Sequence, residues 1–138
     1  MQILIDTNVL LDYLAKREPF FDDARQILAA CSRGNLDGIV AAHSLPNIIY
    51  IMRKYIPLGR IKRIIIDLCS IVEIESIDAV KLHEALHDQE FNDFEDCLQY
   101  QCALSGDVDY IVTRNPHDFR ASSIPVISPH QLCILINQ

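Results

Sequence analysis

The feature that most constrains the fold is an alternation of short apolar runs with longer amphipathic segments. Five runs are short enough for strands and lie at residues 2–5, 38–41, 71–74, 110–113 and 124–127. The segments between them carry apolar residues at three- and four-residue spacing, which is typical of helices. This pattern predicts an α/β fold, with a central and mostly parallel sheet of about five strands flanked by helices on both faces.

Helices are expected at residues 19–33, 44–55, 58–69, 77–89 and 93–105, with a last one after Pro129. Ser44 is the expected N-cap of its helix, and Gly34 is the expected C-cap of the helix before it. The 138 residues contain no internal repeat and no linker, and half of them are hydrophobic. We therefore expect residues 1–138 to form a single three-layer domain.

The charge distribution is uneven along the chain. The formal charge of -7 argues against sequence-independent adhesion to nucleic acids, because contacts with phosphates need lysine and arginine. Residues 53–63 nevertheless hold five of the twelve basic residues and no acid, whereas acids crowd residues 84–96. The basic segment is either two solvated helix ends around a turn at Pro57 and Gly59, or a patch that attracts phosphates.

Nothing in the sequence indicates a membrane or an oxidising compartment. No apolar run reaches the roughly 18 residues that span a bilayer, and no signal-peptide pattern opens the chain. The five cysteines are odd in number and form no C-x-x-C pair, which argues against a disulfide framework and a zinc knuckle. We expect a cytoplasmic protein with free thiols and no membrane partner.

Asp6 follows the first apolar run, in the stretch ILIDTNVLLDYL. In parallel α/β sheets ligands bind at the carboxyl ends of the strands, so such a position is a first candidate for a site. A carboxylate at the end of a buried strand costs free energy unless it is hydrogen-bonded, paired with a cation or bound to a metal. Two interpretations stay open: Asp6 caps the following helix through the amides of residues 8 and 9, or it binds a metal.

A second acidic feature is the pair formed by Asp93 and Asp96 in FNDFEDCLQYQCA. The two side chains should share one face of the helix expected there, while Glu95 should point elsewhere. Like charges so placed repel each other, and a cation between them would reverse that effect. Capping is again the alternative, with Asp93 as the N-cap and both acids favoured by the helix dipole.

Residues 83–87 read HEALH and match the helical zinc motif H-E-x-x-H, in which both histidines bind zinc and the glutamate is the general base. Glu90 stands where the extended form of that motif needs a glycine. A zinc hydrolase using His83, Glu84 and His87 is therefore an alternative enzyme class. The plainer interpretation is that these histidines lie half-exposed on a surface helix, beside an apolar stripe.

Three stretches together resemble the PIN domain family, and in particular the bacterial branch that includes toxin ribonucleases of toxin-antitoxin pairs. They are ILIDTNVLLDYL, DFEDCLQYQCAL and DYIVTRNPHDF, and they follow one another in the family's order and spacing. The resemblance covers the chain from residue 2 to about residue 128. It implies a PIN-like fold, a metal-dependent endoribonuclease that hydrolyses RNA phosphodiesters, an antitoxin protein as partner, and a homodimer.

The resemblance also implies roles for particular residues. On the matching positions, Asp6, Asp93 and Asp96 would be the catalytic acids that hold Mg²⁺ or Mn²⁺, and Asn8 would orient Asp6. Hard oxygen ligands suit these ions, which can activate water and stabilise charge on a phosphate. The basic side chains that would contact RNA are Arg53, Lys54, Arg60, Lys62, Arg63 and Arg114.

The sequence departs from the family pattern at one position of the expected site. The helix after the second strand usually begins S/T-x-x-E, with the glutamate as a metal ligand, whereas this chain has Asn47 there. Thr113 and Asn115 match the polar positions that close the site, although many members carry aspartate at the latter. We expect one metal, or weak affinity until RNA arrives, and slow catalysis. The alternative is a degenerate PIN domain that binds RNA or a partner without cleaving.

Overall fold

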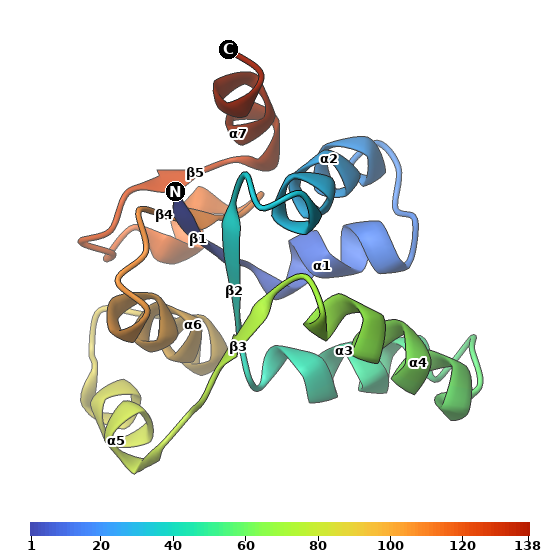
Figure 1. Ribbon diagram of the computed structural model, residues 1–138. Coiled ribbons are helices and arrows are strands. Elements are labelled where there is room, and N and C mark those ends of the chain that lie inside the picture. Colours follow the sequence, from blue (N-terminus) through green and yellow to red (C-terminus); the bar gives the residue numbers. More distant parts are fainter.

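A parallel sheet with the strand order β3-β2-β1-β4-β5 forms the centre of the protein (Figure 1). The computed structural model describes all residues from 1 to 138. Each of the five predicted runs forms a strand, and the bounds differ from the predicted ones by at most two residues. The strands are β1 (Gln2–Ile5), β2 (Asp37–Ala41), β3 (Glu73–Glu75), β4 (Tyr110–Val112) and β5 (Val126–Ile127).

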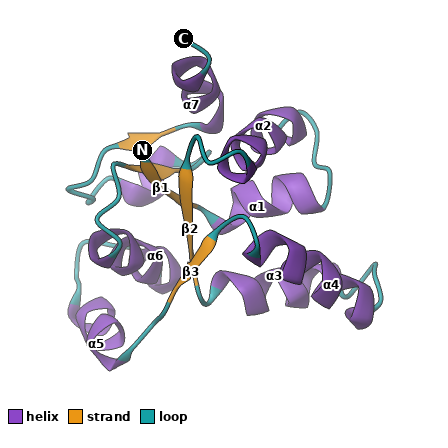
Figure 2. Cartoon of the chain, in the orientation of Figure 1, coloured by secondary structure: helices purple, strands orange, loops and turns teal.

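Seven α-helices and one short 3₁₀ helix surround the sheet, as Figure 2 shows in purple. The α/β class predicted from the sequence is confirmed. None of the helices is both long and apolar enough to cross a membrane. The helices are α1 (Thr7–Leu14), α2 (Phe21–Ser32), α3 (Ser44–Met52), α4 (Leu58–Cys69), α5 (Ala79–His87), α6 (Phe94–Ser105) and α7 (Pro129–Ile136), with the 3₁₀ helix η1 at Pro116–Phe119.

The two faces of the sheet are covered by different helices. Successive side chains of a strand point to opposite faces, so neighbouring residues of one strand pack with different helices. On one face, Ile3 and Ile5 belong to a large apolar core shared with α1, α2, α3, α4 and α7. On the other face, Leu4 and Ile111 pack with α6 and with Phe119 of η1. Helix α5 contacts the outer side of α6.

Two predicted helix caps differ from the structure. Helix α3 begins at Ser44 itself, with His43 in the N-cap position, so the prediction of Ser44 as N-cap is wrong. The Ser44 hydroxyl instead forms a hydrogen bond of 2.7 Å with the hydroxyl of Thr7. At the end of α2 the C-cap is Arg33, and Gly34 follows it with a φ of 78°, the left-handed conformation that glycine adopts freely.

Candidate functional site

The largest cavity of the protein, about 570 Å³, lies where the loops after β1 and β4 and the first turns of α3 and α6 meet. Its lining includes five carboxylates and no lysine, arginine or histidine. The structure therefore brings all three predicted acids to one place at the sheet edge. The lining residues are Asp6, Thr7, Asn8, Leu11, Asn47, Tyr50, Ile51, Asp93, Glu95, Asp96, Gln99 and Asp118.

Asp6 is the most buried of the five acids, with 4% of its surface exposed. Its Oδ1 accepts a hydrogen bond of 3.0 Å from Nε2 of Gln99, and its Oδ2 accepts one of 2.8 Å from the Thr113 hydroxyl. Asp6 occupies the N-cap position of α1, but its side chain makes no capping hydrogen bond. The capping interpretation is therefore wrong for this side chain, which is held by two neutral donors and no cation.

Gln99 is one of the lining residues that the sequence reasoning missed. It is 2% exposed, and its Oε1 also accepts the amide hydrogen of Thr7 at 3.2 Å. The hydrogen bonds that orient Asp6 thus come from Gln99 and Thr113 rather than from Asn8, which lines the cavity. A signal was present, because Gln99 follows Asp96 by three residues and so shares its face of the helix.

Thr113 and Asn115 are not among the residues that line the cavity. Thr113 is fully buried, and its hydroxyl oxygen accepts the amide hydrogen of Asn115 at 3.0 Å while donating to Asp6. The hydroxyl thus donates its proton to Asp6 and accepts one hydrogen bond, which leaves it a second acceptor position. Thr113 therefore positions Asp6, and Asn115 acts through its backbone, while its side chain is exposed.

The N-cap and the first turn of α6 together carry three of the five carboxylates. Asp93 is the N-cap of this helix and accepts the amide hydrogen of Asp96 at 2.9 Å, as the capping alternative predicts. Asp93 also lines the cavity, so capping does not remove it from the site. Glu95 was expected to point elsewhere, but it lines the same cavity, and its Oε2 accepts a hydrogen bond of 3.1 Å from Nδ2 of Asn47.

Burial and the neighbouring carboxylates both act on Asp96. The pKa of Asp96 is raised to about 7, first by burial and then by the charges of Asp93, Asp6 and Asp118. Asp118, which comes from η1, is a second lining acid that was not predicted as a site residue. None of the five lining acids takes part in an ion pair with a basic side chain. The site therefore holds negative charge that no protein cation neutralises.

His43 is a titratable base on which the charges of Glu95 and Asp93 act, and it does not supply the missing positive charge. Burial lowers its pKa, although the charges of Glu95 and Asp93 act in the opposite direction. Both of its ring nitrogens are buried without a hydrogen-bond partner. A lowered pKa favours the neutral ring at physiological pH.

The donor set fits a hard divalent cation in its chemistry. The lining offers carboxylate and amide oxygens and no sulfur or imidazole, which suits Mg²⁺ and Mn²⁺. The side chains do not form a ready-made cage, because no three acidic, histidine or cysteine groups converge at coordination spacing. Binding of a cation there requires the exposed acids to turn toward it, whereas Asp6 is already fixed.

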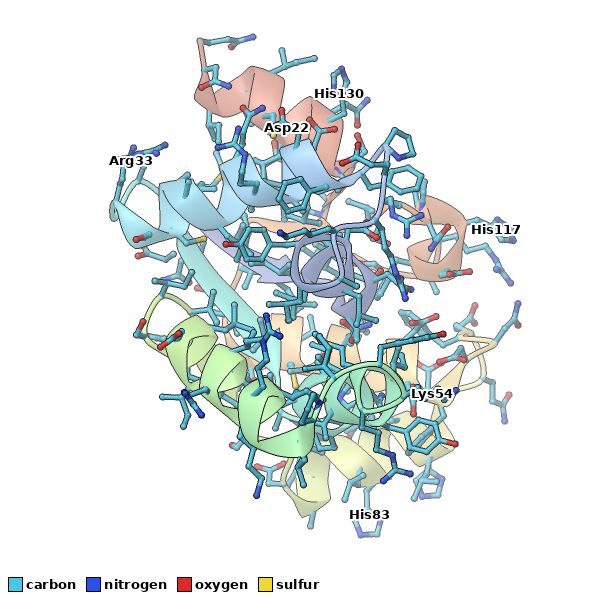
Figure 3. The ribbon with its side chains drawn as sticks, turned by 90° about the vertical axis from the view of Figure 1, so that its right-hand side faces the viewer. Asp22, Arg33, Lys54, His83, His117 and His130 are labelled. Atoms are coloured by element: carbon cyan, nitrogen blue, oxygen red, sulfur yellow. The ribbon has the colours of Figure 1, made fainter.

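The predicted RNA-binding residues divide into two groups. Arg114 lies away from the cavity lining and donates two hydrogen bonds to the buried Asp12, at 2.6 and 3.1 Å, with its guanidinium 3.9 Å from the centre of the Phe20 ring. Arg53 and Lys54 are exposed, and their charged groups lie 4.8 and 5.5 Å from the centre of the Tyr50 ring, which lines the cavity. Lys54 is labelled in Figure 3.

The remaining basic residues of segment 53–63 lie on α4, where all three are exposed: Arg60, Lys62 and Arg63. Helix α3 ends at Met52 and α4 begins at Leu58, so the segment consists of two solvated helix ends around a turn. Only its first two basic residues contact a residue of the cavity lining.

The HEALH motif lies on α5, which packs on the outer side of α6. His83, Glu84 and His87 are all exposed, and Figure 3 shows His83 projecting outward from the molecule. The side chains that α5 buries are those of Lys81 and Ala85. The zinc-hydrolase alternative therefore has neither a cavity nor a third ligand to support it.

Residues 2–117 match the PIN domain family. The chain therefore belongs to this family, as the three sequence stretches predict. No curated protein sequence matches the chain significantly.

Solved structures share the fold over most of the chain. VapBC2 from Rickettsia felis, bound to a promoter DNA fragment, has a TM-score of 0.68 and 15% identity, over 93% of this chain and 98% of that chain. A toxin-antitoxin complex from Klebsiella pneumoniae has a TM-score of 0.68 and 24% identity, over 92% and 97%. VapC20 from Mycobacterium tuberculosis, described as a toxin that cleaves the sarcin-ricin loop, has 0.62 and 15%, over 79% and 86%.

Proposed function

We propose that the protein is a metal-dependent endoribonuclease and the toxin of a toxin-antitoxin pair. The observation that carries this proposal is the cavity of five carboxylates with no ion-pair partner, built around the fixed Asp6 in a PIN fold. Structures of similar fold include a toxin-antitoxin complex and a toxin described as cleaving the sarcin-ricin loop.

Mg²⁺ or Mn²⁺ would be held by Asp6, Asp93 and Asp96. When bound, such an ion supplies Lewis-acid stabilisation of the phosphate and lowers the pKa of water. Gln99 and Thr113 keep the Asp6 carboxylate in one orientation, so that this ligand loses little entropy on binding. Asp96, whose pKa is raised to about 7, would release its proton on binding a cation.

RNA would approach the cavity over the α3 side. The cavity itself repels phosphates, so cations beside it are needed to hold the strand. Arg53 and Lys54 provide them, and the Tyr50 ring, 57% exposed, offers a flat face on which an unpaired base can stack. This arrangement favours single-stranded RNA as substrate. Arg114 is committed to Asp12, and we assign it no contact with RNA.

The test is cleavage of a labelled single-stranded RNA by the purified protein with Mn²⁺ or Mg²⁺. We expect cleavage that EDTA stops and that Asp6→Ala reduces by at least about a hundredfold, with unchanged circular dichroism. Glu84→Ala, which removes an exposed acid outside the cavity, is the matched control and should cleave like the wild type. Cleavage that persists in Asp6→Ala would reject the site assignment.

A partner antitoxin and a homodimer are part of the same proposal. The antitoxin would be encoded by a small adjacent gene, and its peptide would cover the cavity. The pair would act in the cytoplasm. Co-expression with the neighbouring gene should give a complex without nuclease activity. A gene with no such neighbour would count against the toxin role and leave the nuclease role untouched.

A non-cleaving PIN domain is the second candidate, and Asn47 is the observation that favours it. An amide in place of a carboxylate weakens cation binding in this cavity. RNA binding that survives EDTA, together with no cleavage at high Mn²⁺, would support this candidate over the nuclease.

A further inference from the structure

We propose that Glu95 supplies the metal-binding carboxylate that the α3 position of Asn47 lacks, and that Asn47 positions it. This inference rests on the proposed metal-dependent function. It assigns to the first turn of α6 a ligand that the resemblance to the family places on α3.

The hydrogen bond between the two side chains is the first observation. Nδ2 of Asn47 and Oε2 of Glu95 are 3.1 Å apart, although the residues are 48 positions apart in the sequence. Both side chains line the cavity that contains Asp6. The Glu95 carboxylate therefore lies beside the place where a glutamate at position 47 would put its own.

The bonding of the pair is the second observation. The amide of Asn47 donates one hydrogen to Oε2, and no other hydrogen bond of the Glu95 side chain is present, so Oε1 is unpaired. No arginine or lysine forms an ion pair with Glu95. One oxygen is thus held in place, and the other is available to a cation.

Charge balance supports the same assignment. The cavity has five carboxylates with Asn47 and Glu95. It would also have five if a glutamate stood at position 47 and a neutral residue at position 95. The helix dipole explains why an acid is tolerated in the first turn of α6. It does not explain why the side chain turns to a partner on α3, because an acid facing solvent would gain the same benefit.

The experiment measures Mn²⁺ binding by titration calorimetry on the metal-free full-length protein, without RNA. We expect Glu95→Gln to weaken binding by about tenfold or more. The exchange variant Asn47→Glu/Glu95→Gln should recover affinity to within about threefold of the wild type, because the carboxylate returns to α3. Glu90→Gln removes a nearby exposed acid outside the cavity and should change the affinity by less than about twofold.

Circular dichroism melts establish that each variant is folded. Should the exchange variant fail to fold, Glu95→Asp replaces it: the charge is kept but the reach is shortened, so affinity should fall between those of the wild type and Glu95→Gln. Wild-type affinity in Glu95→Gln would overturn the inference, as would an exchange variant that folds and stays as weak as Glu95→Gln.

The outcomes separate this inference from the function on which it rests. A wild type that binds neither Mn²⁺ nor Mg²⁺ overturns both. A wild type that binds Mn²⁺, loses it on Asp6→Asn and keeps it on Glu95→Gln overturns the role of Glu95 alone.

Discussion

Two aspartates of the chain are almost completely buried, and their surroundings differ in one respect. Asp12, 1% exposed, accepts two hydrogen bonds from Arg114 and has Arg17 at 3.9 Å. Asp6, 4% exposed, accepts hydrogen bonds only from the neutral groups of Gln99 and Thr113. The protein neutralises the first charge itself and leaves the second without a counter-charge.

This difference separates a structural carboxylate from one that suits a ligand. A buried charge that is hydrogen-bonded to neutral donors is oriented, but its field remains. The negative field of Asp6 adds to those of Asp93, Asp96 and Asp118. The negative charge of Asp12 is instead neutralised by the guanidinium of Arg114. The electrostatic free energy of binding a cation is therefore more favourable at the Asp6 cavity than near Asp12.

The largest expected effect is on the stability of the protein and concerns Asp12. Asp12→Asn should lower the free energy of unfolding by about 3 kcal/mol, because Arg114 keeps its charge without a partner. Urea denaturation measures this change. In the variant Asp12→Leu/Arg114→Met, which removes both charges, most of the loss should be recovered. A loss below about 1 kcal/mol in the single variant would contradict the structural role of this pair.

At Asp6 we expect a small effect on the metal-free stability and a large effect on stabilisation by Mn²⁺. Asp6→Asn should change the metal-free stability by less than about 1 kcal/mol, because the Thr113 hydroxyl can either donate or accept. At a Mn²⁺ concentration of about 100 times Kd, the wild type should gain about 2.7 kcal/mol and the variant almost none. Thermal melts with and without Mn²⁺ measure both quantities. Equal stabilisation of the two proteins would show that Mn²⁺ binds elsewhere.

A smaller effect concerns pH and Asp96. Because its pKa in the folded protein is about 7 and the ordinary value is 3.8, the native state binds this proton more tightly than the unfolded chain does. The free energy of unfolding therefore falls as the pH rises from about 4 to about 7. Asp96→Asn should remove this dependence and stabilise the metal-free protein at pH 8 by about 1 kcal/mol, a value reduced by partial solvent exposure.

Denaturation with urea at pH 5 and pH 8 tests this prediction. Asp67→Asn is the matched control, because it removes an exposed acid of α4 and should leave the pH dependence unchanged. A pH dependence in Asp96→Asn equal to that of the wild type would mean that other groups cause it.

The smallest effect concerns RNA rather than stability. Tyr50→Ala should weaken binding of single-stranded RNA by about fivefold, the low end of the range for loss of one stacked base, while Tyr50→Phe should bind normally. Fluorescence anisotropy in EDTA measures binding without cleavage. Tyr55→Ala is the control, because Tyr55 is 85% exposed but does not line the cavity. Equal losses in the two alanine variants would exclude a specific role for Tyr50.

The sheet and the place of the site were predictable because both depend on local patterns. The alternation of apolar runs and amphipathic segments predicted all five strands, and parallel strands bring their carboxyl ends to one edge. Asp6 and the acids of α6 were expected at that edge for this reason, and they line one cavity there. The helix bounds were less accurate, since α3 ends at Met52 rather than at residue 55.

The partners of the site residues were not predictable, because they depend on contacts between distant parts of the chain. Asp6 was expected to bond with amides two and three residues ahead, but its partners lie 93 and 107 residues away. The same holds for Glu95 with Asn47, and for Arg114 with Asp12. In each pair, packing of helices on the sheet decides which of several possible donors is within reach.

The distance along the chain between Asp6 and its two donors also bears on biosynthesis. Thr113 is added to the growing chain 107 residues after Asp6. A nascent chain cannot complete the cavity until η1, which carries Asp118, has left the exit tunnel and folded. Synthesis of these 107 residues after Asp6 therefore precedes any assembled site on the chain.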